Sequence, residues 1–463
     1  MAKRSMSAGE KELRSYLRRH PKTRTIELLI ADVNGILRGK QIQRHEFEKC
    51  FADGFAMPGG TVLLDCLGDI VEGIGFSSED GDPDLPASVV PGRLAETPWS
   101  SADAGQSMFR FLGFDGEPFV ADPRTVLESA VAKLQRRCPR IVMAAELEFY
   151  LLDVNADRPT PRMSRVPGLG RPQPGPQVYT PEELWEIEPF LEDLHRTCEI
   201  QQIPAGTTTS EFAPGQFEIN LNHVDDPVLA CDHAVLLKRA VKAVARKHGY
   251  AACFMAKPFE ALAGCGLHVH MSLYDRQGRN YFSQGRDRAA EAPYSARLRH
   301  AIGGLRATMA DATLIFAPNA NSYRRLRPEM FAPVEPNWGA NHRNVALRVP
   351  ASGEKNLRFE HRTAGADANP YLVTAAILAG VHRGLTDRLD PGPMVEERQR
   401  VTLKQRIPNR WDAAIDRFAR SKALREFFGE EFVRLYTGNR RVEEQRVHNQ
   451  VTNIDYDWYL RAV

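Results

Sequence analysis

Four short segments of the sequence alternate apolar residues with residues that bind metals or anions. They read IVMAAELEFYLL (141–152), QFEINL (216–221), GLHVHMSL (266–273) and LRFEHR (357–362). Successive side chains of a β-strand point to opposite faces, so each alternation predicts a strand with one apolar face. The other face of each segment carries Glu, His, Asn, Ser or Arg. The fold must therefore bring several such strands together and give their polar faces a common use.

The first segment places two carboxylates on its polar face. Glu146 and Glu148 would project from the same side of the strand, roughly 7 Å apart at the usual rise per residue. Taken alone, the segment is equally compatible with an exposed face that carries two solvated glutamates. In an apolar setting, the two carboxylates would repel each other and lose hydration unless a cation lay between them. Because the pattern recurs in four strands, we favour the second interpretation.

The polar faces and one nearby carboxylate together supply a set of hard metal ligands. Five glutamates and one histidine suit Mg²⁺ or Mn²⁺, and neighbouring arginines suit phosphate and carboxylate groups. The six residues are Glu146, Glu148, Glu211, Glu218, His268 and Glu360. Metal, phosphate and carboxylate together indicate ATP-dependent chemistry on an acid. The sequence has no GxxxxGK[ST] loop and no kinase signature, so another architecture must hold the nucleotide.

Some of these residues also have ordinary structural interpretations. Two histidines in a sheet are often simply packed there, which applies to His268 and His270. Exposed cations are common on any surface, which applies to Arg343, Arg348 and Lys355.

Composition excludes several other classes of protein. Hydrophobic residues make up 43% and charged residues 26% of the 463 residues, which is typical of a globular protein. A net charge of +2 favours neither nucleic acid nor an anionic membrane as a partner. Seven scattered cysteines without a C-x-x-C pair argue against a disulfide framework or a zinc–thiolate site. With neither a signal-like start nor a long apolar run, we expect a cytoplasmic protein.

The patterning divides the chain near residue 115. Asn34-Gly35 between two apolar runs predicts a hairpin over 25–37, and the stretch 79–93 lacks periodicity and predicts a loop. We expect a small β-rich domain over residues 1–115 and a larger domain over 116–463.

In the larger domain, apolar periodicity predicts four helices. One begins at residue 123, and the others cover about 181–201, 228–248 and 370–386. We expect mostly short strands from 211 to 362 and amphipathic helices in the C-terminal tail. The proline-rich stretch 157–177 predicts a long loop.

Taken in order, these segments resemble the glutamine synthetase superfamily, from about residue 25 to the end of the chain. The matching stretches are AAELEFYLLD (144–153), EFAPGQFEINL (211–221), GCGLHVHMSL (264–273), NSYRRL (321–326), NHRNVALRVP (341–350) and RFEHRTAGADANPYL (358–372). Within the superfamily, the chain is most similar to the γ-glutamylpolyamine synthetases, for example in LLIADVNGILRGK and the ending DYDWYLRAV.

The resemblance implies an α+β fold: a β-grasp-like N-terminal domain followed by a glutamine-synthetase-type catalytic domain with a curved antiparallel sheet flanked by helices. It also implies a homo-dodecamer of two hexameric rings with active sites between subunits. In its chemistry, ATP phosphorylates the γ-carboxyl of glutamate, and an amine then displaces phosphate.

Carried over residue by residue, the resemblance also assigns the site. One divalent ion would be held by Glu148, Glu211 and Glu218, and a second by Glu146, His268 and Glu360. Glutamate would contact Gly264, His268, Arg325 and Arg362. ATP would contact His270, Ser272, Arg343, Arg348, Lys355 and Arg358. The residues expected to act in catalysis are Arg325, Arg343 and Glu360.

The chain departs from the ammonia-using enzymes at two positions. Acids that help form their ammonium pocket are replaced by Phe331 in PEMFAP (328–333) and by Pro58 in MPGGT (57–61). An alkylammonium gains apolar contact and cation–π attraction from such residues, whereas ammonium gains little. We therefore expect a polyamine acceptor such as putrescine or spermidine. Candidates for contact with it, or with its distal charge, are Trp338, Glu329, Glu335, Asp65 and Asp69.

Three alternatives remain open at the level of sequence. The same ligase could use a monoamine or ethanolamine, because pocket residues alone do not separate these acceptors. A glutamine synthetase proper would use ammonia, which the two replaced acids oppose. A catalytically silent regulatory homologue should have lost metal ligands, and all six are present.

Overall fold

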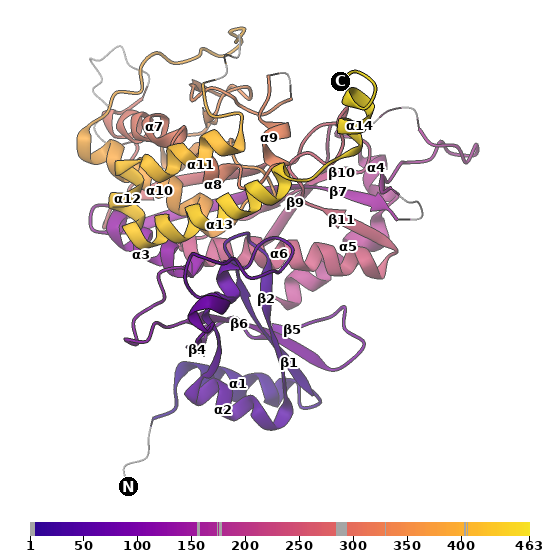
Figure 1. Ribbon diagram of the computed structural model, residues 1–463, viewed down its shortest axis with the longest axis vertical. Helices are drawn as coiled ribbons and strands as arrows, with labels where there is room; N and C mark the ends of the chain where they lie inside the picture. Colours follow the sequence, from indigo (N-terminus) through magenta and orange to yellow (C-terminus); the bar gives the residue numbers. More distant parts are fainter. Residues whose placement is uncertain are drawn as a thin grey trace.

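The computed structural model describes residues 5–154, 158–173, 175, 178–283, 294–328, 330–401, 404 and 406–463. Two β-sheets organise these residues, a six-stranded sheet within 25–111 and a nine-stranded sheet within 140–361. In Figure 1 the first sheet, in indigo and violet, lies at the lower end beside α1 and α2. The second lies above it among most of the helices, which confirms the predicted α+β class. The β-grasp comparison and the boundary near residue 115 stay predictions.

The N-terminal sheet has the strand order β2-β1-β6-β4-β3, with β5 on β6. Only the pairing of β1 with β6 is parallel. Helices α1 (Ala8–Arg19) and α2 (Phe47–Asp53) accompany the sheet. Its strands are β1 (Thr25–Ala31), β2 (Leu37–Gln43), β3 (Phe55–Pro58), β4 (Asp84–Val89), β5 (Ala95–Glu96) and β6 (Ala104–Phe111).

The predicted hairpin is confirmed, and the predicted loop is partly wrong. Strands β1 and β2 pair up to Ala31 and Leu37, and the connection turns at Gly35, whose φ of +75° suits glycine. The stretch 79–93 contains β4, whose alternate residues Leu85, Ala87 and Val89 are buried. The short apolar alternation of β4 was not recognised in the sequence because prolines and acidic residues flank it.

The nine-stranded sheet has the order β13-β14-β15-β12-β7-β10-β9, with β8 and β11 also on β7. Strand β7 (Arg140–Asp153) is the longest and lies between β12 and β10. All pairings are antiparallel except that of β13 with β14. The other strands are β8 (Thr160–Pro161), β9 (Ala205–Ser210), β10 (Gln216–Leu221), β11 (Tyr250–Cys253), β12 (Leu267–Tyr274), β13 (Trp338–Ala340), β14 (Leu347–Val349) and β15 (Phe359–His361).

Helices flank this sheet, largely where apolar periodicity predicted them. Helices α3 (Pro123–Gln135), α6 (Pro227–Lys247) and α10 (Pro370–Asp387) match the predicted spans closely. The span 181–201 instead contains two helices, α4 (Pro181–Trp185) and α5 (Glu188–Ile200).

Helix α7 (Ala296–Met309) corrects our expectation of mostly strands between 211 and 362. The short helices α8 (Thr313–Phe316) and α9 (Ser322–Arg325) follow it. Glycines favour turns in sequence reasoning, but Gly304 lets α7 contact α10 closely. A Cβ there would lie 2.0 Å from the backbone oxygen of Gly380.

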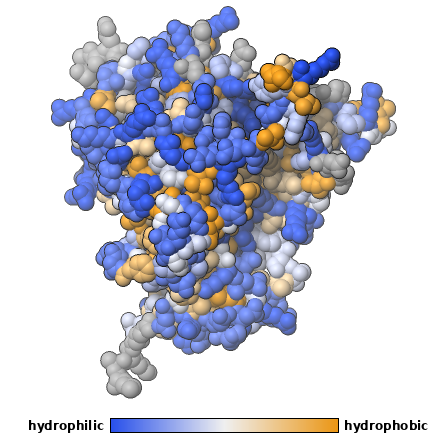
Figure 2. Space-filling model, viewed as in Figure 1, coloured by the Kyte–Doolittle hydropathy of each residue, from blue (hydrophilic) through white to orange (hydrophobic). Residues whose placement is uncertain are grey.

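The C-terminal tail is helical, as expected. It contains α11 (Trp411–Arg420), α12 (Lys422–Phe428), α13 (Glu430–His448) and α14 (Asn453–Tyr459). Hydrophobic side chains remain exposed on and beside α14, among them Ile454, Trp458 and Leu460, and Figure 2 shows hydrophobic residues gathered there.

Other features bear on the remaining sequence predictions. All seven cysteines lie in the described part of the chain as free thiols. Within that part, no helix is both long and apolar enough to span a bilayer. The described residues of the proline-rich stretch include β8 and a bridge between Arg165 and Pro172, while several others lie outside the described residues.

A buried carboxylate joins the N-terminal segment to three helices of the catalytic part. Asp232 of α6 is fully buried and accepts hydrogen bonds from Arg93 Nε at 2.9 Å and Arg124 Nε at 3.0 Å. The hydroxyl of Tyr371 in α10 donates to the same carboxylate at 2.7 Å. Removing one partner of a buried charge network leaves the other charges unpaired, which is strongly destabilising.

We expect Asp232→Ala to lower the free energy of unfolding by about 3 kcal/mol or more, measured by urea denaturation. Asp193→Ala is the matched control, because Asp193 forms a largely exposed pair with Lys247 at 2.7 Å. That control should lose less than about 1 kcal/mol. Equal losses in the two variants would show that the buried network does not hold these elements together.

Candidate active site

The strand register brings the predicted polar faces side by side. On β7, Glu146 lies directly opposite His268 of β12, and Glu148 lies directly opposite Glu218 of β10. Residues paired in this way project from the same face of the sheet. Leu147 and its neighbours on the other face are buried in the core. The alternation read in the sequence is therefore a real division between a core face and a polar face.

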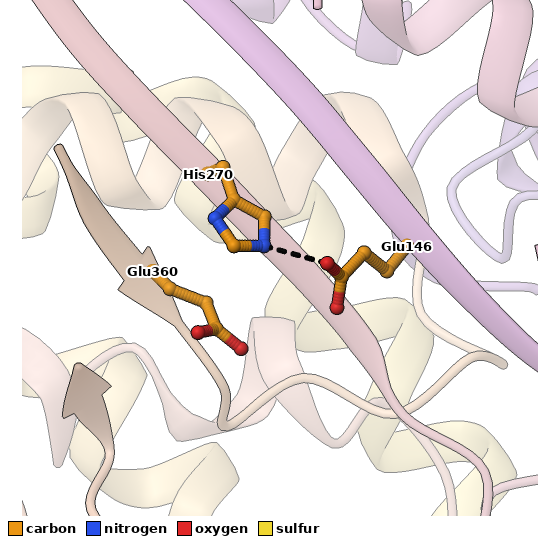
Figure 3. Close-up of side chains that lie close together, drawn as sticks. All are labelled: Glu146, His270 and Glu360. Carbon is orange, nitrogen blue, oxygen red and sulfur yellow. Dashed lines mark hydrogen bonds and ion pairs between the residues drawn. The ribbon is translucent and has the colours of Figure 1, made fainter. Parts of the chain in front are cut away.

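A second row of polar residues continues across β12, β15 and β14. His270 lies opposite Glu360, which in turn lies opposite Arg348. Figure 3 shows Glu146, His270 and Glu360 converging from three strands. Glu146 Oε1 lies 2.8 Å from His270 Nε2, and the ligand atoms of all three residues lie within 4.8 Å of one another. This spacing is compatible with a shared cation.

His268 lies at the centre of a second group. Its Nδ1 is 3.2 Å from Glu146 Oε2, 3.9 Å from Glu218 Oε2 and 3.9 Å from Glu360 Oε1. Its Nε2 is 3.8 Å from Glu148 Oε1. The structure thus places four of the predicted metal ligands around a fifth, the imidazole of His268.

The electrostatics of this cluster favour a cation. Burial, followed by repulsion from Glu146 and Glu148, raises the pKa of Glu218 to about 9. Burial and the charge of Glu148 raise the pKa of Glu211 to about 7. Ionising these two carboxylates is costly because they are buried near other carboxylates, and the nearby Arg343 and Arg362 offset this only in part. A divalent ion would neutralise this charge, and oxygen and imidazole donors fit Mg²⁺ or Mn²⁺.

Hydrogen-bond donors and arginines of the protein offset the charge of Glu146 and Glu360. Burial opposes ionisation of Glu146, but hydrogen bonds from His268 and His270 lower its pKa overall. The pKa of Glu360 is lowered in spite of its burial, chiefly by Arg362, which donates to it. Arg348 Nη1 donates to the same carboxylate at 2.9 Å. The cluster is therefore graded, with unneutralised charge near β10 and arginines near β14 and β15.

A buried guanidinium adjoins the metal-ligand cluster. Arg325 of α9 is 4% exposed, and its Nη1 donates to the backbone oxygen of Thr363 at 2.9 Å. The chain passes close to it: a Cβ on Gly266 would lie 2.9 Å from both Arg325 Nη2 and His268 Nε2 and would displace these side chains. A Cβ on Gly264 would lie 2.5 Å from the backbone oxygen of Ala256. Arginine and close backbone here suit a carboxylate ligand.

Predicted ATP contacts continue along the polar face of β12. Ser272 follows His270 on that face and is buried, and Arg358 Nε lies 3.3 Å from His270 Nδ1. Arg343 and Lys355 are exposed in the loops before β14 and β15. These cations thus lie on segments next to the polar face.

Phe331 belongs to an aromatic group that the sequence analysis did not identify. Its ring stacks on that of Phe212 at 5.3 Å between centroids, and Phe212 meets Tyr179 edge-on at 6.3 Å. Phe331 is 70% exposed, and its φ of +57° is rare for an aromatic residue. The hydroxyl of Tyr179 accepts a hydrogen bond from Arg343 at 3.3 Å. A signal was available, since Phe212 directly follows Glu211.

Trp338 and Pro58 were predicted to contact the amine, but the structure places neither beside Phe331. Trp338 is 3% exposed and donates its indole N–H to the backbone oxygen of Gly392. It pairs with Leu347, so it lies on the face opposite to Arg348, away from the cluster. Pro58 is exposed in the N-terminal sheet, opposite Asp84.

The acidic candidates for the distal charge are engaged elsewhere. Glu335 pairs with Arg406 at 3.1 Å, and Asp65 and Asp69 both pair with Arg446. Glu329 lies outside the described residues.

The curved sheet, its acidic metal-ligand face and the buried arginine define a catalytic domain of the glutamine synthetase type. Residues 120–459 match the family described as glutamine synthetase, catalytic domain, and the chain belongs to that family. It is accordingly a ligase, and enzymes of this family use ATP and divalent metals.

Similarity to individual proteins extends over nearly the whole chain. γ-Glutamylputrescine synthetase PuuA of Escherichia coli is 38% identical, with 98% of this chain and 95% of the relative aligned. Glutamate–isopropylamine ligase of a Pseudomonas species is 29% identical, with 98% of each chain aligned. Among solved structures, apo GmaS without ligand has a TM-score of 0.82 at 25% identity and covers 98% of this chain and 100% of its own.

We expect Glu218→Gln to raise the melting temperature of the metal-free protein, because it removes one of the crowded carboxylates. The same change should abolish the stabilisation by Mn²⁺, which at a hundredfold excess over Kd amounts to about 2.7 kcal/mol in the parent. Differential scanning fluorimetry with and without Mn²⁺ measures both effects. Glu192→Gln, on the exposed side of α5, is the control and should behave as the parent. A full Mn²⁺ response in the Glu218 variant would contradict the metal-site assignment.

Proposed function

We propose that this protein uses ATP to join the γ-carboxyl of L-glutamate to a primary amine, with a polyamine such as putrescine or spermidine as the acceptor. The observation that carries the proposal is the cluster of buried carboxylates beside the buried guanidinium of Arg325. The relatives named above as acting on putrescine and isopropylamine support an organic amine as acceptor.

The reaction follows from the chemistry of an acid and an amine. A carboxylate is a poor acyl donor, so the γ-carboxyl first takes the terminal phosphoryl group of ATP to give γ-glutamyl phosphate and ADP. The neutral amine then attacks the acyl carbon, phosphate leaves, and the nitrogen releases a proton. Bound divalent ions would neutralise charge on the transferred phosphoryl group.

The ligand assignments carried over from the family are part of the proposal. One Mg²⁺ or Mn²⁺ ion would be held by Glu148, Glu211 and Glu218, and a second by Glu146, His268 and Glu360. The distances of 3.2–3.9 Å from His268 to four of the carboxylates support metal binding by this cluster.

Substrate contacts divide between the two ends of the polar face. Arg325 and Arg362, with Gly264 and His268, would bind glutamate, because a buried guanidinium beside glycine backbone suits a carboxylate. The ATP contacts would be His270, Ser272, Arg343, Arg348, Lys355 and Arg358. Arg325, Arg343 and Glu360 would act on the reacting groups.

Phe331, Phe212 and Tyr179 would form an aromatic wall for the acceptor. Their exposed rings offer the apolar contact and cation–π attraction that an alkylammonium can use. Phe212 is joined to Glu211 in the chain, so the wall lies next to a proposed metal ligand. Trp338 is left out of this pocket because it is buried on the other face.

We also propose a homo-dodecamer of two hexameric rings in the cytoplasm. The exposed hydrophobic residues of α14 support contacts with other subunits. Active sites between subunits would allow Pro58 of a neighbouring subunit to complete the acceptor pocket. The seven free cysteines suit a reducing compartment.

The first test measures phosphate release from ATP with Mg²⁺ and glutamate, offering putrescine, spermidine, isopropylamine, ethanolamine and ammonia separately. We expect turnover with a polyamine and little with ammonia. Ammonia as the best acceptor would overturn the acceptor assignment, and no turnover with any amine would favour a silent homologue. Glu148→Ala should abolish turnover with every acceptor.

We expect Phe331→Ala to lower kcat/KM for putrescine about tenfold by loss of cation–π and apolar contact, which corresponds to about 1.4 kcal/mol. The KM for ATP should not change. Phe114→Ala is the matched control, because Phe114 is 71% exposed in the turn before α3. An unchanged kcat/KM in the Phe331 variant would exclude this ring from the acceptor pocket.

A further inference from the structure

A large cavity lies outside the metal-ligand cluster. It has a volume of about 1450 Å³ and opens between the β1–β2 turn, α6, the C-terminal part of α13 and the segment before α9. Figure 1 shows α6 between the two sheets, close to the β1–β2 hairpin and α13. None of the six metal-ligand candidates lines it. Its volume exceeds that of ordinary small-molecule pockets, so it has room for a ligand.

Helix α6 presents a row of like charges to this cavity. Lys238, Lys242 and Arg246 follow one another at four-residue spacing, and all three line the cavity. Residues four apart share one face of a helix, and like charges so placed destabilise it. Burial, followed by the charge of Lys242, lowers the pKa of Lys238 to about 8. Lys238 is buried, whereas Lys242 and Arg246 are exposed, so the row concentrates positive charge on this side of the cavity.

Several other cations of the cavity have acidic partners, whereas those of the row and Arg324 do not. Arg239 pairs with Glu27, and Arg440 pairs with Glu443 at 2.8 Å. Lys238 Nζ instead donates to the backbone oxygen of Ala366 at 2.8 Å. Across the described part of the chain, no ion pair with an acid is formed by Lys242, Arg246 or Arg324.

Part of the remaining wall is apolar, while Asp65, Asp367 and Glu443 also line the cavity. Val235, Phe254 and Trp99 line it, and the ring of Phe254 lies beneath Lys238 Nζ at 5.4 Å and Lys242 Nζ at 5.8 Å. A ligand that fits this lining carries negative charge on one side and an apolar portion on the other.

The cavity is linked to the active site through consecutive residues of α9. Arg324 lines the cavity, whereas Arg325 adjoins Gly264, Gly266 and the metal-ligand cluster. The same helix is held by Asp367, which also lines the cavity and accepts a hydrogen bond from Ser322 at 2.6 Å. A ligand that engages Arg324 would act directly on the position of Arg325.

We propose that this cavity binds a small-molecule anion with at least two negative charges. These charges lie beside the cationic groups of Lys238, Lys242, Arg246 and Arg324. Phosphoryl and carboxylate groups share the required chemistry. Its occupancy changes the affinity for glutamate through Arg324 and Arg325, and this second statement rests on the proposed glutamate site. The effect on glutamate is reciprocal, since coupled binding sites influence each other equally.

The binding test uses the full-length, metal-free protein in differential scanning fluorimetry, with inorganic pyrophosphate and citrate as separate probes. We expect a rise of several degrees in the melting temperature of the parent with at least one probe. The double variant Lys242→Glu/Arg246→Glu should lose that rise. Arg196→Glu, on the exposed side of α5, is the control and should respond as the parent.

The outcomes distinguish a phosphoryl ligand from a carboxylate ligand, and they distinguish binding in the cavity from coupling to the glutamate site. A response to pyrophosphate alone assigns phosphoryl groups, a response to citrate alone assigns carboxylates, and a response to both assigns charge as the determinant. Equal responses of the parent and the double variant, or no response in the parent, would overturn the site.

The coupling is tested by the KM for glutamate in the metal-loaded enzyme, which the active probe should change at least twofold in the parent but not in the double variant. An unchanged KM would overturn the coupling and leave binding intact. A parent without ligase activity would contradict the proposed function, whereas the fluorimetry result would stand.

Discussion

Mutual repulsion among buried carboxylates is the constraint on which the catalytic part of this structure depends. Glu146, Glu148 and Glu218 lie on one face of the sheet, held there by backbone pairing that cannot relax them apart. Burial, together with this crowding, raises the pKa of Glu218. Such a face is stable only when cations accompany it, from the protein on one side and from divalent metal on the other.

Hydrogen-bond donors and arginines of the protein offset the negative charge on one side of the site more than on the other. His268 and His270 stabilise Glu146, and Arg362 stabilises Glu360, so the face is nearly balanced toward β14 and β15. Toward β10 the negative charge is less well balanced, so a metal ion would bind most favourably there. The proposed phosphoryl transfer needs metal and guanidinium groups around one reacting group, and the site offers candidate ligands for the metal beside arginines.

Positive charge is left unbalanced in the cavity that Arg324, the neighbour of Arg325, lines. The cations of the row on α6 repel one another at the edge of the cavity, as the carboxylates do on the sheet. In both places, side chains of like charge are kept together by secondary structure, by strand register in one case and by helical spacing in the other. We infer a ligand of opposite charge from both, a metal ion on the sheet and a small anion at the helix.

Strand alternation and apolar periodicity in the sequence predicted the polar strand faces and the helices α3, α6 and α10, and donor type predicted the candidate metal ligands, because periodicity and donor type are local properties. The α+β class was implied by the family resemblance. Only the tertiary structure decided which ligands meet around His268, that Trp338 lies on the opposite face, and that Phe212 and Tyr179 accompany Phe331. Helix α7 was not predicted either. Its glycines contact α10 across the fold, and the sequence does not show that contact. The physical reason is the same in each case: register and packing join residues far apart in the chain, and no local pattern records which partner a side chain will meet.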